Sequence, residues 1–188
     1  MTNLELLELA TATFADRLAA VGADQWDLPT PCDEWSVRDL VGHVVGGSAM
    51  AVALAEGASM EDAIAVFTGT DLADDATAQF AAVGAEQLAA LSVDGMPEQI
   101  VHHPMGDIPG EMLLGFRIGD LTIHSWDLAR ATGGDETLPD ALVEATWASL
   151  SPMAPMIGST GVFGEGPSGG AADAPLQAQL LDLAGRRP

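Results

Sequence analysis

The sequence predicts an all-α fold, and three observations predict it. Alanine and leucine, which are strong helix formers, dominate the composition, whereas tyrosine is absent and β-branched runs are few. Apolar residues recur at steps of three and four in several segments, with proline and glycine gathered between them. At 188 residues the chain is long enough for one sizeable core and too short for two ordinary domains, so we expect one domain over 1–188.

The first predicted helix covers 3–21. Its apolar positions, among them Leu7 and Phe14, form the one-sided stripe that a surface helix turns toward a core. Gly22 supplies its end. The following stretch, 23–35, contains two prolines and two tryptophans. This composition favours a rigid loop whose aromatic side chains close one end of the core.

The second predicted helix covers 36–56. Ser36 and Asp39 resemble a capping box that begins it. His43 falls at an inward position among apolar residues spaced three and four apart, close to a pair of glycines that lets a neighbour approach. The apolar run 40–55 is shorter than the ~20 residues that span a bilayer, so we expect a buried helix of the core.

The rest of the chain is predicted to alternate between helices and connections rich in proline and glycine. Further helices are expected at 59–69, 72–91, 111–132, 139–150 and 176–184. Between 92 and 110 the density of proline and glycine excludes a helix and favours an extended loop or a small hairpin. The glycine-rich stretch 159–174 is expected to form a surface loop.

Charge and cysteine content limit the partners and the compartment. The formal charge is −22, from 28 acidic residues against 6 arginines and no lysine. Such a chain repels nucleic acid and anionic membrane, because both need basic residues to replace counterions. Cys32 is the single cysteine, so no internal disulfide forms, and we expect the reducing cytoplasm. We interpret Cys32 as a small residue in a structured turn, with a reactive thiol as the alternative.

A candidate metal site lies on the helix predicted at 111–132. Asp120 and His124 stand on one face of it, because four residues advance about 400° and roughly 6 Å along a helix. With His43 they offer two imidazoles and one carboxylate from two helices, as in metal sites of helical bundles. Three protein ligands leave coordination positions open, which is typical of catalytic rather than structural zinc.

Other interpretations of these residues remain open. His43 is also explained as a core histidine bonded to a neighbour, and Asp120 as the ion-pair partner of Arg117, three residues earlier on the same helix face. Asp127 is a further candidate, because it can replace Asp120 as a ligand or orient an imidazole from behind. It can instead pair with Arg130.

No second motif competes with this site. The sequence contains no Ser-His-Asp signature, Walker loop or dinucleotide fingerprint in the expected context. His102 and His103 lie in the stretch rich in proline and glycine, where an exposed loop pair is favoured over a pocket rim. Trp126 is interpreted as a core residue.

Three segments carry a resemblance to a known family. They are 26–43, 120–133 and the ending 180–188. They resemble actinobacterial proteins related to the N-terminal domain of mycothiol-dependent maleylpyruvate isomerase, in the DinB-like superfamily of metal-binding four-helix bundles. The resemblance covers nearly the whole chain and implies a DinB-like four-helix bundle with long crossover loops and extra short helices.

The resemblance also implies the metal ligands. The family's first histidine falls on His43, and its carboxylate–histidine pair falls on Asp120 and His124. The carboxylate is Glu in the isomerase and Asp here, one methylene shorter. Zinc is the expected ion and nickel the alternative, with Arg117 and Asp127 as residues that support the ligands from behind.

The implied function is thiol chemistry at a metal. By resemblance, a low-molecular-weight thiol such as mycothiol serves as cosubstrate for an isomerase or S-transferase that acts on a small electrophile. A metal depresses the pKa of a bound thiol and so supplies thiolate at neutral pH. Maleylpyruvate isomerisation itself is not expected, because the isomerase has a C-terminal domain that this sequence lacks.

Two alternatives belong to other functional classes. One is a metal-dependent protein that binds or senses a small molecule without turnover. The other is a relic of the fold without metal, in which His43 and Arg117 merely satisfy Asp120. The surplus of apolar residues is compatible with a homodimer.

Overall fold

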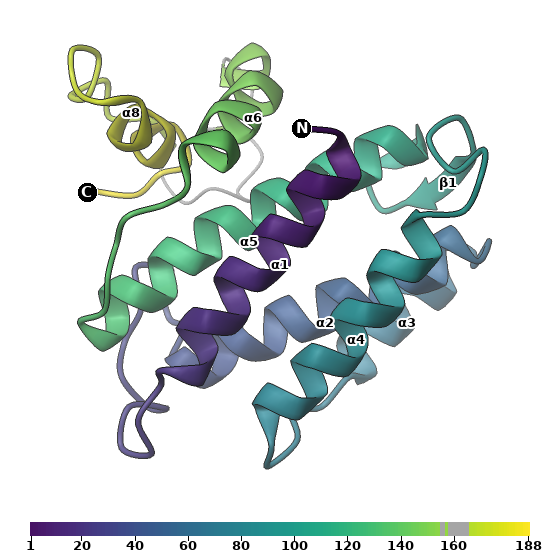
Figure 1. The fold of residues 1–188 in the computed structure, drawn as a ribbon, viewed down its shortest axis with the longest axis horizontal. Coiled ribbons are helices and arrows are strands. Elements are labelled where there is room, and N and C mark those ends of the chain that lie inside the picture. Colours follow the sequence, from purple (N-terminus) through teal and green to yellow (C-terminus); the bar gives the residue numbers. More distant parts are fainter. Residues whose placement is uncertain (155–156, 158–165) are drawn as a thin grey trace.

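The protein is built almost entirely of helices, which confirms the predicted fold class (Figure 1). The computed structural model describes residues 1–154, 157 and 166–188. Its helices are α1 (Asn3–Ala19), α2 (Val37–Ala55), α3 (Met60–Gly69), α4 (Ala76–Leu91), α5 (Gly110–Thr132), α6 (Asp140–Leu150), the 3-10 turn η1 (Ser151–Met153) and α8 (Leu176–Leu183). Strands β1 (Ile100–His103) and β2 (Gly106–Pro109) form an antiparallel hairpin.

Four helices enclose the main core. α1 packs against α4 and α5, and α2 packs against the same two helices, so the four form a closed ring of neighbours (Figure 1). Leu7, Phe14, Leu40, Phe80 and Leu121 are buried between them, and the rings of Phe14 and Phe80 lie 4.9 Å apart. This arrangement brings α2 against α5, the two helices that carry the expected metal ligands.

α2 is a core helix that begins at the predicted capping box. The Ser36 hydroxyl accepts the backbone N–H of Asp39, and the Asp39 carboxylate accepts the backbone N–H of Ser36. Among the described residues it is the one helix long and apolar enough to cross a membrane by length and composition. However, it packs against α3, α4 and α5, and 56% of its apolar window is buried, as expected for a core helix.

The loop between α1 and α2 is held by its own hydrogen bonds. The backbone N–H of Thr30 donates to the carbonyl of Trp35 at 3.0 Å, and the Thr30 hydroxyl accepts the N–H of Cys32 at 3.1 Å. Trp26 and Trp35 pack against the core, in agreement with the predicted aromatic anchors. The loop thereby places Cys32 and Trp35 beside His124 of α5.

Two predicted boundaries differ from the structure by more than one residue. α4 begins at Ala76 rather than at residue 72, because the Asp75 carboxylate accepts the backbone N–H of Ala78 and caps the helix there. α1 ends at Ala19, two residues before the predicted end. The stretch 92–110 contains the small hairpin that was one of its two expected forms.

A second, smaller apolar cluster attaches α6 and α8 to α5. Ile123 and Trp126 of α5 meet Val143 of α6 and Leu180 of α8. The cluster brings the end of the sequence close to α5, which carries two of the expected metal ligands (Figure 1). Of the surface loop predicted at 159–174, residues 159–165 lie outside the described residues and the remainder contains no helix. The single-domain organisation over 1–188 stays a prediction.

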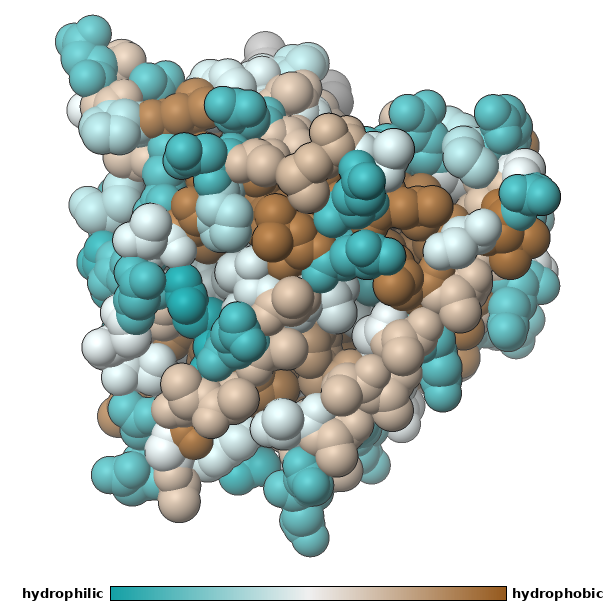
Figure 2. Space-filling model, viewed as in Figure 1, coloured by the Kyte–Doolittle hydropathy of each residue, from teal (hydrophilic) through white to brown (hydrophobic). Residues whose placement is uncertain are grey.

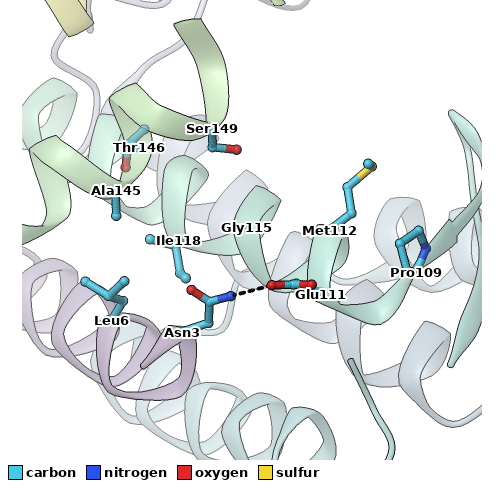
Figure 3. Close-up of a pocket in the computed structure, with 10 residues that line it drawn as sticks. All are labelled: Asn3, Leu6, Pro109, Glu111, Met112, Gly115, Ile118, Ala145, Thr146 and Ser149. Carbon is cyan, nitrogen blue, oxygen red and sulfur yellow. Dashed lines mark hydrogen bonds between the residues drawn. The ribbon is translucent and has the colours of Figure 1, made fainter. Parts of the chain in front are cut away.

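A cavity of about 350 Å³ lies between α1, α5 and α6 (Figure 3). Asn3 and Glu111 form a hydrogen bond of 3.4 Å in its wall, and Ile118 and Thr146 line its other side. On the same face of the molecule, hydrophobic side chains gather where α6 approaches α1 and α5 (Figure 2). None of the expected metal ligands lines this cavity.

A pair of glycine substitutions tests the packing. A Cβ at Gly110 would lie 2.0 Å from the carbonyl oxygen of Met96. We therefore expect Gly110→Ala to lower the free energy of unfolding by about 1–3 kcal/mol. At Gly42 in α2 a Cβ meets no atom within 4 Å. Gly42→Ala should raise the same free energy by roughly 0.5–1 kcal/mol, since alanine has the better helix propensity.

Urea unfolding followed by circular dichroism measures both glycine variants against the unsubstituted protein. Equal changes at Gly42 and Gly110 would contradict the close contact between the start of α5 and Met96.

Candidate metal centre

The structure brings together the three expected ligands. Nε2 of His43, on α2, lies 3.3 Å from Oδ1 of Asp120, on α5. Nε2 of His124, one turn further along α5, lies 3.4 Å from the same oxygen. The two imidazole rings are 5.1 Å apart and close to perpendicular. Two nitrogens and one carboxylate oxygen thus point to one place between the helices.

The two separations from Asp120 Oδ1 fit a divalent ion. Zinc binds nitrogen and oxygen ligands at about 2.0–2.1 Å in tetrahedral geometry, which sets neighbouring ligand atoms roughly 3.4 Å apart. The distances of 3.3 and 3.4 Å from Asp120 Oδ1 match that value. They are longer than the ~2.9 Å of a typical N–H···O hydrogen bond. The residues present therefore suit the expected ion.

Arg117 holds the other oxygen of Asp120. Its Nη1 donates to Oδ2 at 2.8 Å, so the ion pair expected from the sequence forms without involving Oδ1. Arg117 is buried, and its remaining N–H groups donate to Gln87, to Ser48 and to a backbone carbonyl of α2. A Cβ at Gly47 would lie 2.5 Å from Arg117 Nη1. The glycine in α2 therefore makes room for the guanidinium.

Asp127 supports His124 from the opposite side of its ring. Oδ2 of Asp127 lies 3.0 Å from Nδ1 of His124, and the carboxylate is fully buried. This is the orienting position that was one of the two roles expected of Asp127. The expected alternative partner, Arg130, instead pairs with Glu136 at 2.6 Å, so that interpretation was wrong.

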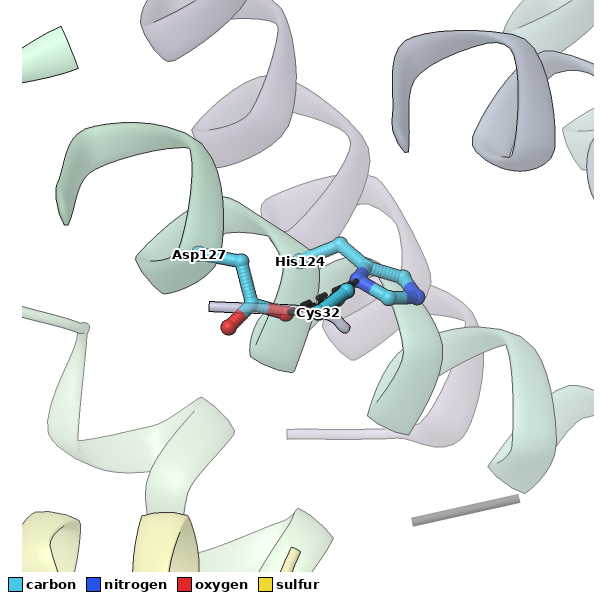
Figure 4. A group of neighbouring side chains, drawn as sticks. All are labelled: Cys32, His124 and Asp127. Carbon is cyan, nitrogen blue, oxygen red and sulfur yellow. Dashed lines mark hydrogen bonds and ion pairs between the residues drawn. The ribbon is translucent and has the colours of Figure 1, made fainter. Parts of the chain in front are cut away.

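Two contributors to the site escaped the sequence analysis, namely Cys32 and Arg186. Sγ of Cys32 lies 3.4 Å from Oδ2 of Asp127 and 4.0 Å from Nδ1 of His124 (Figure 4). Arg186 donates to both oxygens of Asp127 and, at 3.1 Å, to Sγ of Cys32. The reactive thiol was one interpretation of Cys32 as the single cysteine, whereas Arg186 had no signal beyond its place in a segment that carries the resemblance.

Cys32, His124 and Asp127 form a second group with the atom types of a metal site. The Arg186 guanidinium lies 2.6 Å from Oδ2 of Asp127 and 3.1 Å from Sγ of Cys32. Arg186 therefore already occupies two of the candidate ligand atoms of this group. Arg117, in contrast, binds only Oδ2 of Asp120 and leaves Oδ1 to the two imidazoles, so the group formed by His43, Asp120 and His124 is the better cation site.

His102 and His103 lie on the hairpin, apart from this cluster. Nδ1 of His102 is 2.7 Å from Oδ1 of Asp107 across the two strands, and both side chains are exposed. The ring of His103 packs beside Phe116 at 5.4 Å. Among the described residues, neither histidine belongs to a group that can hold a metal.

The charges of the metal-free cluster are strongly coupled. Burial alone would raise the pKa of Asp120, but Arg117 and His124 outweigh burial and hold it well below its usual range. Burial alone would lower the pKa of His124, but Asp120 and Asp127 raise it well above its usual range. A metal ion must therefore compete with a proton for Nε2 of His124.

The raised pKa of His124 makes the stability of metal-free protein depend on pH. The folded state binds this proton more tightly than the unfolded state does. Its stabilisation is therefore complete below the unfolded pKa of about 6.5 and is lost as the pH rises toward the folded value. We expect chelator-treated protein to unfold at lower urea concentrations as the pH rises above about 6.5.

The matched variants separate His124 from the other titrating groups. His124→Gln should flatten this part of the profile, whereas His102→Gln on the exposed hairpin should leave it unchanged. Stability of the unsubstituted protein that increases over the same interval would contradict the raised pKa of His124.

Comparisons with known proteins identify the family of this chain. The family model described as "Mycothiol maleylpyruvate isomerase N-terminal domain" matches residues 7–129, which include His43, Asp120 and His124. Two uncharacterised proteins of Mycobacterium tuberculosis, MT0763 of strain CDC 1551 and Rv0738 of strain H37Rv, are each 38% identical over 162 residues. The match covers 86% of this chain and 85% of each relative.

Solved structures show the same fold. The crystal structure of the mycothiol-dependent maleylpyruvate isomerase superposes with a TM-score of 0.65 at 17% identity, and that of a single-site mutant superposes with 0.65 at 16%. Each match covers 81% of this chain and 68% of the isomerase chain. Because this family model matches more than half of its length, the chain belongs to the mycothiol maleylpyruvate isomerase N-terminal domain family.

Proposed function

We propose that the protein is a divalent-metal-dependent thiol enzyme, an isomerase or S-transferase that uses mycothiol or a similar thiol on a small electrophile. The observation that carries the proposal is the convergence of His43 Nε2, Asp120 Oδ1 and His124 Nε2. Membership of a family named for mycothiol-dependent isomerisation supports the choice of cosubstrate. The substrate itself is left at the level of a chemical class.

The ligand set suits an ion with open coordination positions. Two imidazoles and one carboxylate are three protein ligands, as in catalytic zinc sites, and nickel is the alternative to zinc. The side chains of His43 and Asp120 are 27% and 24% exposed, whereas that of His124 is 9% exposed. The site therefore opens to solvent on the side of His43 and Asp120. When bound there, the ion would lower the pKa of a thiol in an open position and supply thiolate at neutral pH.

The surrounding residues hold the proposed ligands in the orientation that a metal ion needs. Arg117 engages Oδ2 of Asp120 and leaves Oδ1 directed at the imidazoles. Asp127 accepts the Nδ1–H of His124, so the lone pair of the neutral imidazole lies on Nε2, which faces Asp120. The ring of Trp35 lies 4.7 Å from His43 and 6.0 Å from His124, and so shields one side of the site from water.

The proposed ligands predict the metal content of the purified protein. We expect about one zinc ion per chain in the unsubstituted protein, and a loss of most of it in His43→Ala and in His124→Ala. His102→Ala, which removes an exposed histidine from the hairpin, should keep the full content. Inductively coupled plasma mass spectrometry after dialysis measures all four proteins. Equal metal in all of them would overturn the proposed site.

The proposed chemistry predicts direct binding of a thiol. Adding mycothiol or a simpler thiol analogue to cobalt-substituted protein should produce a thiolate-to-metal absorption band, which His124→Ala should not show. Turnover is then measured with a panel of small electrophiles. Neither a thiol band nor turnover would contradict the function, whereas a bound thiol or other small molecule retained without turnover would favour the binding or sensing alternative.

A further inference from the structure

We propose that Arg186 is a positioning residue for the candidate metal centre, because it fixes Asp127 and through Asp127 the direction of His124. Arg186 lies outside residues 7–129, which the family model matches. The inference deepens the proposed function and rests on it, since it assigns the end of the sequence a part in the same site.

The end of α8 is shaped so that Arg186 reaches the site. Gly185 has a φ of +77°, the left-handed conformation that glycine adopts without strain. The N–H of Gly185 donates to the carbonyl of Asp182, and the N–H of Arg186 donates to the carbonyl of Leu181 at 2.8 Å. These two bonds make a Schellman motif, which ends the helix and turns the chain in a fixed direction. The backbone of Arg186 is therefore held before its side chain makes any contact.

The side chain of Arg186 makes two hydrogen bonds to the carboxylate of Asp127. Nε donates to Oδ1 at 3.0 Å, and Nη2 donates to Oδ2 at 2.6 Å. Two parallel bonds fix the plane of the carboxylate as well as its position. Nη1 donates to the carbonyl of Ala184 at 2.7 Å, which ties the guanidinium back to its own turn. The arginine side chain is only 9% exposed and that of Asp127 is 0% exposed, so water does not compete for these bonds.

One of the two Asp127 oxygens that accept from Arg186 also faces His124. Oδ2 of Asp127 accepts from Arg186 Nη2 and also lies 3.0 Å from Nδ1 of His124. The orientation of the imidazole, and hence the place of its Nε2, follows the orientation of that carboxylate. Cys32 closes the remaining side, because its Sγ contacts both Asp127 and Arg186. A residue 62 positions after His124 thereby sets the direction of a proposed ligand.

Arg187 provides the matched control. It is the neighbouring arginine, but its side chain is 49% exposed and it bonds to Asp182 and to the carbonyl of Gly166 rather than to Asp127. We expect Arg186→Gln to weaken zinc affinity roughly 10–100-fold, the range seen when groups that support metal-bound histidines are removed. Arg187→Gln should leave the affinity unchanged, and Arg186→Lys should recover only part of the loss, because lysine cannot make the two-point contact.

A double-mutant cycle separates positioning from general stabilisation. Once Asp127→Asn has removed the carboxylate, Arg186→Gln should cause little further loss of zinc affinity. Circular dichroism confirms that each variant is folded at the temperature of the titration. Full loss from Arg186→Gln in the Asp127→Asn background, or no loss in the unsubstituted background, would overturn the positioning role.

A second readout needs no metal. In the chelator-treated protein the Nδ1–H of His124, bonded to Asp127, should give a downfield proton resonance that exchanges slowly with water. The resonance should persist in Arg187→Gln and broaden or disappear in Arg186→Gln. If no zinc binds the unsubstituted protein, the proposed function fails, yet this resonance still decides the role of Arg186. An unchanged resonance in Arg186→Gln would overturn that role.

Discussion

The rest of the site depends on how Asp120 uses its two carboxylate oxygens. One oxygen faces the two histidines and the other accepts from Arg117. If Arg117 were absent, both oxygens would be free to turn toward the imidazoles, and the single convergence point between α2 and α5 would be lost. The buried guanidinium is in turn fixed by Gln87 and Ser48, which come from two different helices of the ring.

A second pair of arginine and aspartate stabilises the other end of the site. Arg186 donates hydrogen bonds to Asp127, as Arg117 does to Asp120, and each ion pair is buried or half-buried. A buried charge is tolerated only where a partner and good geometry offset its desolvation, so each of these arginines needs its carboxylate as much as the carboxylate needs it. Hydrogen bonds and ion pairs therefore link α4, α5 and the turn after α8, and each of them holds the next side chain in place.

Local patterns were sufficient to predict much of this arrangement. Asp120 and His124 share a face because of helical spacing, and His43 was recognised from its inward position in an apolar helix. The structure places the three side chains together, and their role as metal ligands stays a prediction. The capping box at Ser36 likewise depends on residues three apart. The predicted start of α4 is too early, because the pattern of apolar residues already begins before Asp75, the residue that caps the helix.

Cys32 and Arg186 could not be found in this way. Their contact joins residues 154 positions apart, and it depends on how a loop and a terminal turn pack against α5. The partners of Arg186 and Cys32 at the site, Asp127 above all, do not lie at helical or strand spacing from them in the sequence. The role of Gly47 is of the same kind, since a pair of glycines predicted a close approach but not that the approaching group is a guanidinium.

The burial of two arginines also changes the exterior of the protein. Arg117 and Arg186 are two of its six cationic side chains, and both are enclosed within the site. The solvent-facing charge is consequently more one-sided than the composition suggests. The resulting negative potential should concentrate divalent cations near the exposed side of the proposed site, at His43 and Asp120, over a range of about 8–10 Å at physiological ionic strength. Association of a metal ion with the proposed site should therefore be fastest at low salt, while the inner arginines keep the interior of the site from being equally anionic.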